Sequence, residues 1–184
     1  RFWPSRCARQ RHFGGAGAVD SVVFADGETV EADAVIVAIG TTPNVELAER
    51  AELRRGATGG VAVDRTMRTE DPHVFACGDC AEKVSFFGGK PSPLKLASIA
   101  TAEARIAGAN LFETRRENIG TIGVWSTCIG DTAFATAGLT EELAEQHGYN
   151  YVTGEAEAPN RHPGGMPGTR PLKAKMVFEK HTGA

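Results

Sequence analysis

The sequence predicts an α/β region followed by a smaller α+β unit, in a chain of 184 residues. Three patterns support this fold class. Residues 34–40 form a continuous apolar run, which is typical of a strand covered on both faces in a parallel sheet. Residues 94–112 are rich in alanine and carry larger apolar residues at helical spacing. After about residue 119, short strand-like segments surround one further helix, which indicates a separate α+β unit.

The composition makes several classes of function improbable. Hydrophobic residues make up 41% of the chain and charged residues 23%, as is ordinary for a globular protein. Because the net charge is -3 and no apolar run approaches the roughly 20 residues of a membrane span, we expect neither nucleic acid nor a membrane as a partner. Four cysteines are too few for a disulfide scaffold in a chain of this length, so we expect a reducing, cytoplasmic location.

Local signals predict the other elements. Asp26-Gly27 separates two runs rich in β-forming residues and predicts a hairpin, because glycine adopts a positive φ without steric cost. Thr140, followed by Glu141 and Glu142, predicts a helix start, since a threonine side chain caps free N–H groups. Short strands are expected at residues 21–24, 29–32, 61–64, 74–77, 122–129, 132–136, 149–153 and 172–179, and a short helix at residues 45–53.

The stretch with the clearest chemical meaning is residues 69–79, where an apolar segment ends in Gly78-Asp79. In nucleotide-binding sheets, a glycine at this place lets a ligand approach the backbone. The following carboxylate accepts hydrogen bonds from sugar or ribityl hydroxyl groups. For an isolated Gly-Asp pair, a simple turn would be the better interpretation, so its surroundings decide the matter.

The order of four segments resembles the FAD-dependent pyridine nucleotide-disulfide oxidoreductase family. These segments are Ile39-Gly40-Thr41-Thr42-Pro43-Asn44, then Val63-Asp64, then residues 69–79, then the helix at residues 94–111. Within that family the chain is most similar to the branch of NADH oxidases and coenzyme A-disulfide reductases. The similarity runs from about residue 19 to the end of the chain.

The resemblance implies FAD as a cofactor, with NAD(P)H in the complete enzyme. Gly40 would close the NAD(P)-binding domain, and Gly78 and Asp79 would contact the ribityl chain of FAD. The helix start around Lys95 would direct backbone N–H groups at the pyrimidine edge of the flavin, where they favour the anionic reduced form. The cofactor-binding residues implied are Gly40, Gly78, Asp79, Leu94, Lys95 and Leu96. No catalytic residue is implied.

The resemblance also implies a domain organisation. Residues 1–17 remain an unassigned tail, and residues 18–56 would be the end of an NAD(P)-binding domain. Residues 57–118 would be the C-terminal part of an FAD-binding domain. Residues 119–184 would be an incomplete dimerisation domain, so we expect a homodimer formed through residues after Ile119.

The chain lacks the Gly-x-Gly-x-x-Gly loops that bind the FAD and NAD(P)H pyrophosphates in this family. In the partial match at residues 15–20, Asp20 stands in place of the third glycine. Two hypotheses follow. In the first, the chain is the C-terminal segment of an FAD-dependent NAD(P)H oxidoreductase that reduces a disulfide, such as coenzyme A disulfide, or oxygen, and is inactive alone. In the second, it is a non-catalytic dimerisation or assembly module derived from this family.

Cys77 and Cys80 have the C-x-x-C spacing of a redox pair or of half a zinc site. A redox pair of this kind usually opens a helix, whereas Cys77 is expected to end a buried strand. A zinc site needs a second pair, and Cys7 and Cys128 are isolated. We therefore expect packing cysteines. The five histidines share no ligand spacing, so no metal site is expected.

Overall fold

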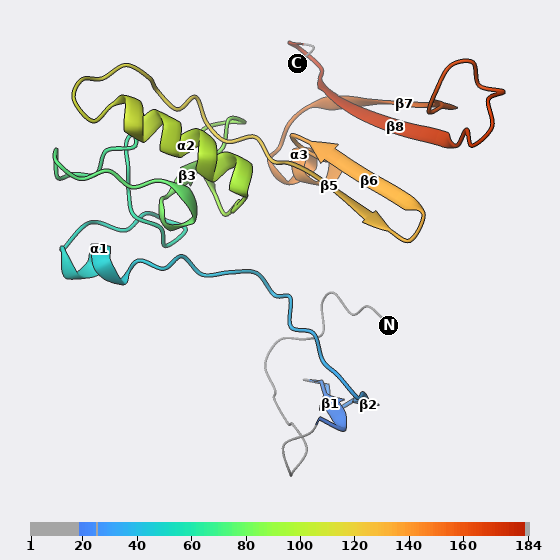
Figure 1. Cartoon of the computed structure of the whole chain (residues 1–184), viewed down its shortest axis with the longest axis horizontal. Coiled ribbons are helices and arrows are strands. Elements are labelled where there is room, and N and C mark those ends of the chain that lie inside the picture. The colour runs from blue at the N-terminus through green and yellow to red at the C-terminus, as the bar shows by residue number, and fades with distance from the viewer. Residues whose placement is uncertain (1–18, 25, 183–184) are drawn as a thin grey trace. The chain divides into compact units, whose positions relative to one another are not determined.

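The computed structural model describes residues 19–24 and 26–182, and the chain divides into two compact units, Arg1–Thr42 and Pro43–Ala184. The tail predicted over residues 1–17 therefore lies outside the described residues. Figure 1 shows the elements in chain order. They are β1 (Ser21–Val23), β2 (Thr29–Glu31), α1 (Glu46–Arg50), the 3₁₀ turn η1 (Gly78–Cys80), β3 (Lys83–Val84), β4 (Pro91–Ser92), α2 (Ala97–Ala109), β5 (Val124–Ile129), β6 (Thr132–Ala137), α3 (Glu141–Gln146), β7 (Tyr151–Pro159) and β8 (Pro171–Glu179).

The first unit contains the predicted hairpin. Strands β1 and β2 pair antiparallel, with Val22 opposite Val30. In the turn, the Gly27 N–H donates to the Phe24 carbonyl at 3.0 Å, and Gly27 has a φ of 87°. Because that backbone conformation strains residues with a Cβ, glycine is the residue that this turn requires. The hairpin prediction is confirmed.

The buried strand predicted over residues 34–40 is wrong. These residues have no regular secondary structure, and the side chains of Ile36 and Ile39 are 92% and 81% exposed. A strand needs a neighbour that accepts and donates its ladder hydrogen bonds. No strand among the described residues pairs with this run. Apolar sequence alone is therefore not enough to form a strand here.

The second unit has a small apolar core. Met67, 1% exposed, packs with Ala81 and with Ala107 of helix α2. Most of the segments around this core are loops, so the helix supplies its longest regular surface. The partly buried residues packed against the core are Val63, Phe75, Ala76, Cys77 and Ile106.

The strands predicted over residues 61–64 and 74–77 are not formed. Each segment makes isolated bridges at one residue, Val61 in the first and Phe75 in the second. A ladder needs consecutive partners, so both segments are extended loops. The predicted parallel sheet is likewise absent from the described residues, whose four sheets are antiparallel pairs of strands. The described chain combines helices with strands, so the fold class is confirmed only as that of a small α/β fragment.

Helix α2 lies within the predicted segment 94–112, and helix α1 lies within the segment 45–53. Alanine favours the helix because its side chain loses no conformational entropy on folding. At 13 residues, α2 is the longest helix of the described chain. None of the helices in that part of the chain has the length and apolar character needed to cross a membrane.

Asn110 closes the end of helix α2 and is 0% exposed. Its side-chain nitrogen donates to the carbonyls of Thr66 at 3.0 Å and Arg116 at 2.8 Å. Its side-chain oxygen accepts from the N–H groups of Arg115 at 2.8 Å and Arg116 at 3.0 Å. One buried amide therefore joins the helix to two loops that are far from each other in sequence.

The elements after residue 119 follow the predicted order. Strands β5 and β6 form one hairpin and β7 and β8 another, with helix α3 between them in sequence. The Thr140 hydroxyl caps α3 by accepting from the Leu143 N–H at 3.3 Å. Gly148, with a φ of 75°, follows the end of the helix. The predicted α+β elements are confirmed, whereas their role in dimerisation stays a prediction.

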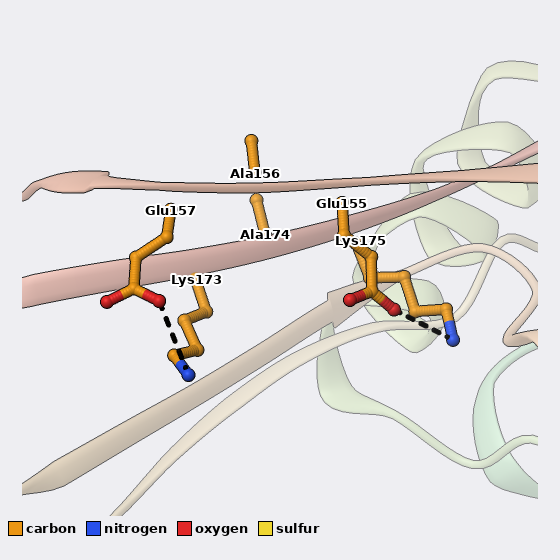
Figure 2. A pocket seen from close by; sticks show the side chains of 6 residues that line it. All are labelled: Glu155, Ala156, Glu157, Lys173, Ala174 and Lys175. Carbon is orange, nitrogen blue, oxygen red and sulfur yellow. Dashed lines mark ion pairs between the residues drawn. The ribbon is translucent and has the colours of Figure 1, made fainter.

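The β7–β8 hairpin has one ionic face and one apolar face. Lys173 pairs with Glu157 at 3.3 Å, and Lys175 pairs with Glu155 at 3.3 Å and also with Glu141 of α3. Figure 2 shows the side chains of the two strands, Glu155, Glu157, Lys173 and Lys175, on one side of the hairpin, with the neighbouring alanines on the other. The apolar face consists of Val152, Gly154, Ala156 and Ala158 on β7 and Leu172, Ala174, Met176 and Phe178 on β8.

Asn110→Ala should lower the free energy of unfolding of the second unit by about 2–4 kcal/mol, because it removes a fully buried amide that makes hydrogen bonds to four backbone groups. Urea unfolding followed by circular dichroism at 222 nm measures this change. The matched control is Asn160→Ala, because the Asn160 side chain is exposed and accepts from only the Arg170 N–H. We expect the control to change stability by less than about 0.5 kcal/mol. Equal unfolding midpoints for the two variants would contradict the structural role of Asn110.

Candidate functional site

The Gly78-Asp79 pair forms the single 3₁₀ turn η1. Cys77 precedes it in an extended conformation, and the Ala81 N–H donates to the Gly78 carbonyl at 3.0 Å. Gly78 has a φ of 77°. A Cβ at this position would lie 3.5 Å from the Cβ of Ala100, which is an ordinary van der Waals distance. The glycine is therefore required by its backbone conformation, and it brings the turn against the first part of helix α2.

Asp79 presents its carboxylate at the surface. The residue is exposed, and it makes no hydrogen bond or ion pair within the part of the chain that the structure describes. A carboxylate in this state is a ready acceptor for hydroxyl groups. The structure places residues 78 and 79 in this turn, and their contact with a ligand stays a prediction.

The start of helix α2 has no side-chain cap. Its N-cap residue, Leu96, is extended and accepts the Ala100 N–H through its backbone carbonyl at 3.0 Å. Ala97 and Ser98 in the first turn are exposed. The first N–H groups of a helix have no partner inside the helix, so an uncapped and exposed start favours an electron-rich group beside it.

Contact between a ligand and the three residues predicted at the helix start stays a prediction. Leu94, Lys95 and Leu96 are all partly buried and lead directly into α2. The Leu94 N–H already donates to the Ser92 hydroxyl at 3.4 Å. No hydrogen bond from the N–H groups of Lys95 and Leu96 occurs among the described residues, and the first turn of α2 begins at Ala97. The Leu94 side chain lies close to the backbone of the later α+β segment, because a Cβ on Gly123 would be 3.2 Å from it.

The turn and the helix start lie together, since Gly78 approaches Ala100 of α2.

Gly40, the remaining predicted site residue, belongs to the first unit. It is exposed, has a φ of 92° and ends a segment without regular structure.

A buried ion pair beneath the turn was not predicted. The side chains of Lys83 and Glu103 are each 2% exposed, and Lys83 Nζ lies 3.0 Å from Glu103 Oε2. The same Glu103 oxygen accepts from the Gly78 N–H at 2.8 Å. Lys83 Nζ also donates to the carbonyls of Gly78 and Ala81. One signal was available in the sequence: Glu103 is four residues from both Ile99 and Ala107, on the apolar face of the predicted helix.

Cys77 and Cys80 are free and partly buried. Cys80 Sγ donates to the Cys77 carbonyl at 3.3 Å, and Cys77 packs against the apolar core. Burial, followed by the nearby Cys80 and Glu103, raises the pKa of the Cys77 thiol. A raised pKa keeps this thiol protonated and weakly reactive. These contacts agree with the predicted packing role of the two cysteines. No group of three or more potential metal ligands occurs among the described residues.

Two surface hollows do not include the Gly78-Asp79 turn. One of about 350 Å³ lies over the ionic face of the β7–β8 hairpin and is lined by the residues that Figure 2 labels. Its four charged side chains are paired with one another, so it offers no unsatisfied charge to a ligand. The other, of about 280 Å³, is lined in part by Asp64, Met67 and Asn118. We assign no site to either hollow.

Gly78→Ala should destabilise the second unit by about 1–2 kcal/mol, because it places a Cβ in the left-handed backbone region. Gly108→Ala is the matched control, because Gly108 lies inside α2 and a Cβ there would have open space. That control should stabilise the helix by about 0.5–1 kcal/mol. Urea unfolding measures both effects. A stabilising Gly78→Ala would show that the strained turn is not part of the folded state.

Comparison with known proteins identifies the family. A family model described as pyridine nucleotide-disulphide oxidoreductase matches residues 8–104. An NAD(P)H sulfur oxidoreductase (CoA-dependent) from Pyrococcus furiosus is 34% identical over 160 residues, which are 87% of this chain and 36% of that protein. An NADH oxidase from Methanocaldococcus jannaschii is 30% identical over 161 residues, or 86% of this chain and 35% of that protein.

A solved structure shares the fold. The FAD-dependent pyridine nucleotide-disulphide oxidoreductase from Desulfovibrio vulgaris superposes with a TM-score of 0.72 at 31% identity, over 92% of this chain and 39% of that one. The chain spans about a third of the length of the curated relatives that it matches. The match to more than half of the chain by the family model, together with these similarities, shows that the chain belongs to the pyridine nucleotide-disulphide oxidoreductase family.

Proposed function

We propose that this chain supplies one side of an FAD site in an NAD(P)H-dependent flavoprotein oxidoreductase. The observation that carries the proposal is the close approach of the Gly78-Asp79 turn to the uncapped start of helix α2. Similarity to an FAD-dependent family member from D. vulgaris supports it. In this proposal, residues 57–118 belong to the FAD-binding domain, and residues 18–56, including Gly40, belong to the NAD(P)-binding domain.

The chemistry of these groups fits a flavin. Asp79 offers an exposed carboxylate without an internal partner among the described residues, which suits the hydroxyl groups of a ribityl chain. The first turn of α2 offers backbone N–H groups, which suit the electron-rich pyrimidine edge. When bound, FAD supplies electron-transfer chemistry that amino-acid side chains lack. The residues named here bind and orient the cofactor, and none of them is proposed to exchange protons.

Each residue has a separate task in this proposal. Asp79 accepts hydrogen bonds from the ribityl hydroxyls, and Gly78 allows the turn to approach the helix. The partly buried side chains of Leu94 and Leu96 limit the access of water to the helix start. Less water strengthens the interaction between the helix N–H groups and negative charge on the reduced flavin.

The reaction of the whole protein is also a proposal. We infer that it carries electrons from NAD(P)H to a disulfide, such as coenzyme A disulfide, or to oxygen. The names of the P. furiosus and M. jannaschii relatives support these two kinds of acceptor. The 184 residues contain neither glycine-rich pyrophosphate loop, so we propose that they do not oxidise NAD(P)H by themselves.

Asp79→Ala should weaken FAD binding at least tenfold, or about 1.4 kcal/mol, in a fluorescence titration of the chain. The reason is the loss of the carboxylate that accepts the ribityl hydroxyls. Asp131→Ala is the matched control, because it removes another exposed carboxylate, from the turn between β5 and β6. That control should bind FAD as the wild type does.

Equal FAD affinity of the wild type and Asp79→Ala would sink the assignment of Asp79. A wild type that does not bind FAD would show that this part of the site is insufficient by itself. Oxidation of NADH above the rate of free FAD, measured on the same preparation, would contradict the proposed inactivity of the isolated chain.

A specific observation favours assembly as a second function. On the apolar face of the β7–β8 hairpin, Val152, Leu172 and Met176 are 47%, 57% and 58% exposed. Large exposed apolar patches are typical of protein interfaces. We propose that residues after Ile119 form a homodimer interface that includes this face. A homodimer interface is compatible with the FAD site. If the chain formed the interface without binding FAD, it would be a non-catalytic assembly module.

Met176→Lys should shift the chain toward monomer in sedimentation velocity, because it places a charge in the apolar face. Thr153→Lys places the same charge on the opposite, ionic face of the hairpin and should leave the sedimentation coefficient unchanged. A wild-type chain that sediments as a monomer at every concentration tested would overturn the proposal. Equal shifts for both variants would indicate a general effect of added charge.

A further inference from the structure

The Gly78-Asp79 turn is bonded on both sides by one buried ion pair. Glu103, on α2, accepts from the Gly78 N–H at 2.8 Å. Lys83, on β3, donates to the Gly78 carbonyl and, at 3.2 Å, to the Ala81 carbonyl. Since an ammonium group has three N–H donors and the third is directed at Glu103, its hydrogen-bonding capacity is fully used.

We propose that Lys83 and Glu103 are positioning residues that fix Asp79 relative to the start of helix α2, and that FAD affinity depends on them. The inference rests on the FAD site proposed above and deepens it. The pair connects three places: the strand that carries Lys83, the helix that carries Glu103 and the turn between them. The two groups proposed to contact FAD, Asp79 and the α2 start, are therefore held at a fixed spacing by buried charges.

Stability alone does not account for this pair. Moving two charges into a protein interior costs desolvation energy that their mutual attraction often fails to offset, and apolar residues of similar volume are frequently as stable. Glu103 Oε1 is also buried without a hydrogen-bond partner among the described residues. An arrangement that leaves such an atom unsatisfied is costly. The pair instead fixes the orientation of the Gly78 backbone, because Glu103 accepts from its N–H and Lys83 donates to its carbonyl.

The exposure of Asp79 explains why the orientation of the Gly78 backbone needs to be fixed. Asp79 makes no contact that would hold it among the described residues. Its orientation is therefore set by the backbone of η1, which has only three residues. Helix α2 is the rigid reference, and Glu103 is the link between that helix and the Gly78 backbone. Removing the pair should therefore loosen the orientation of Asp79, although neither Lys83 nor Glu103 is exposed.

The test compares the full chain with the double variant Lys83→Met/Glu103→Leu, which removes both charges at similar volume. Native-state hydrogen exchange, resolved by NMR, reports on the Gly78 amide without any cofactor, and fluorescence titration reports on FAD. We expect exchange of the Gly78 amide to accelerate at least tenfold and FAD affinity to fall at least tenfold, with the helical circular dichroism signal retained. Lys173→Met/Glu157→Leu, at an exposed ion pair of the β7–β8 hairpin, is the matched control and should change neither.

A second variant keeps the test decisive if the first fails to fold. Lys83→Met/Glu103→Gln retains an amide oxygen that can accept from the Gly78 N–H, so it should recover most of the protection and most of the FAD affinity. Unchanged Gly78 exchange in the folded variants would overturn the positioning role. Accelerated exchange with wild-type FAD affinity would overturn the link to the cofactor. If the wild type itself does not bind FAD, this part of the site is insufficient by itself and the dependence of FAD affinity is overturned for this chain, while the exchange data still decide whether the pair holds the turn.

Discussion

Buried polar side chains of helix α2 hold the loops of the second unit in place. Glu103 bonds the turn at Gly78, and Asn110 bonds the loops at Thr66 and Arg116. In most α/β proteins the ladders of a central sheet do this work. Here the described segments between residues 54 and 82 form isolated bridges and loop hydrogen bonds but no ladder. The polar contacts of one helix therefore add to the bonds that hold those loops, and the candidate site lies on two of the parts so connected.

Elements whose signals are local could be predicted from the sequence. The Asp26-Gly27 turn, the Thr140 cap and the alanine-rich helix each depend on residues a few positions apart. Buried strands could not be predicted in the same way, because a strand exists only with a partner that accepts its hydrogen bonds. Residues 34–40 have the composition of a central strand and are exposed, since no described strand lies beside them.

For the candidate site, too, the sequence predicts the local parts and misses the contacts between distant residues. Its two parts, the Gly78-Asp79 turn and the helix that begins near Leu96, follow from residue types and their order. That the Leu94 N–H is already bonded to Ser92 depends on a local turn that no pattern announces. The Lys83–Glu103 pair joins residues 20 positions apart, on different elements. Charge pairing across such a separation produces no periodic pattern in the sequence. The one available signal is a glutamate on the apolar face of the helix.

The two different faces of the β7–β8 hairpin favour one register between its strands. Side chains alternate between the faces of a strand, so a slip of one strand by a single residue exchanges its inward and outward sets. In this hairpin a one-residue slip of β8 would bring Lys173 and Lys175 to the face of Val152 and Ala156 and would separate them from Glu157 and Glu155. It would also move Leu172 and Met176 to the ionic face. Misaligned molecules would lose their ion pairs and carry charge on the face that is apolar in the correct register. The alternation thus favours the correct register, and only that register presents the apolar face proposed as a homodimer interface.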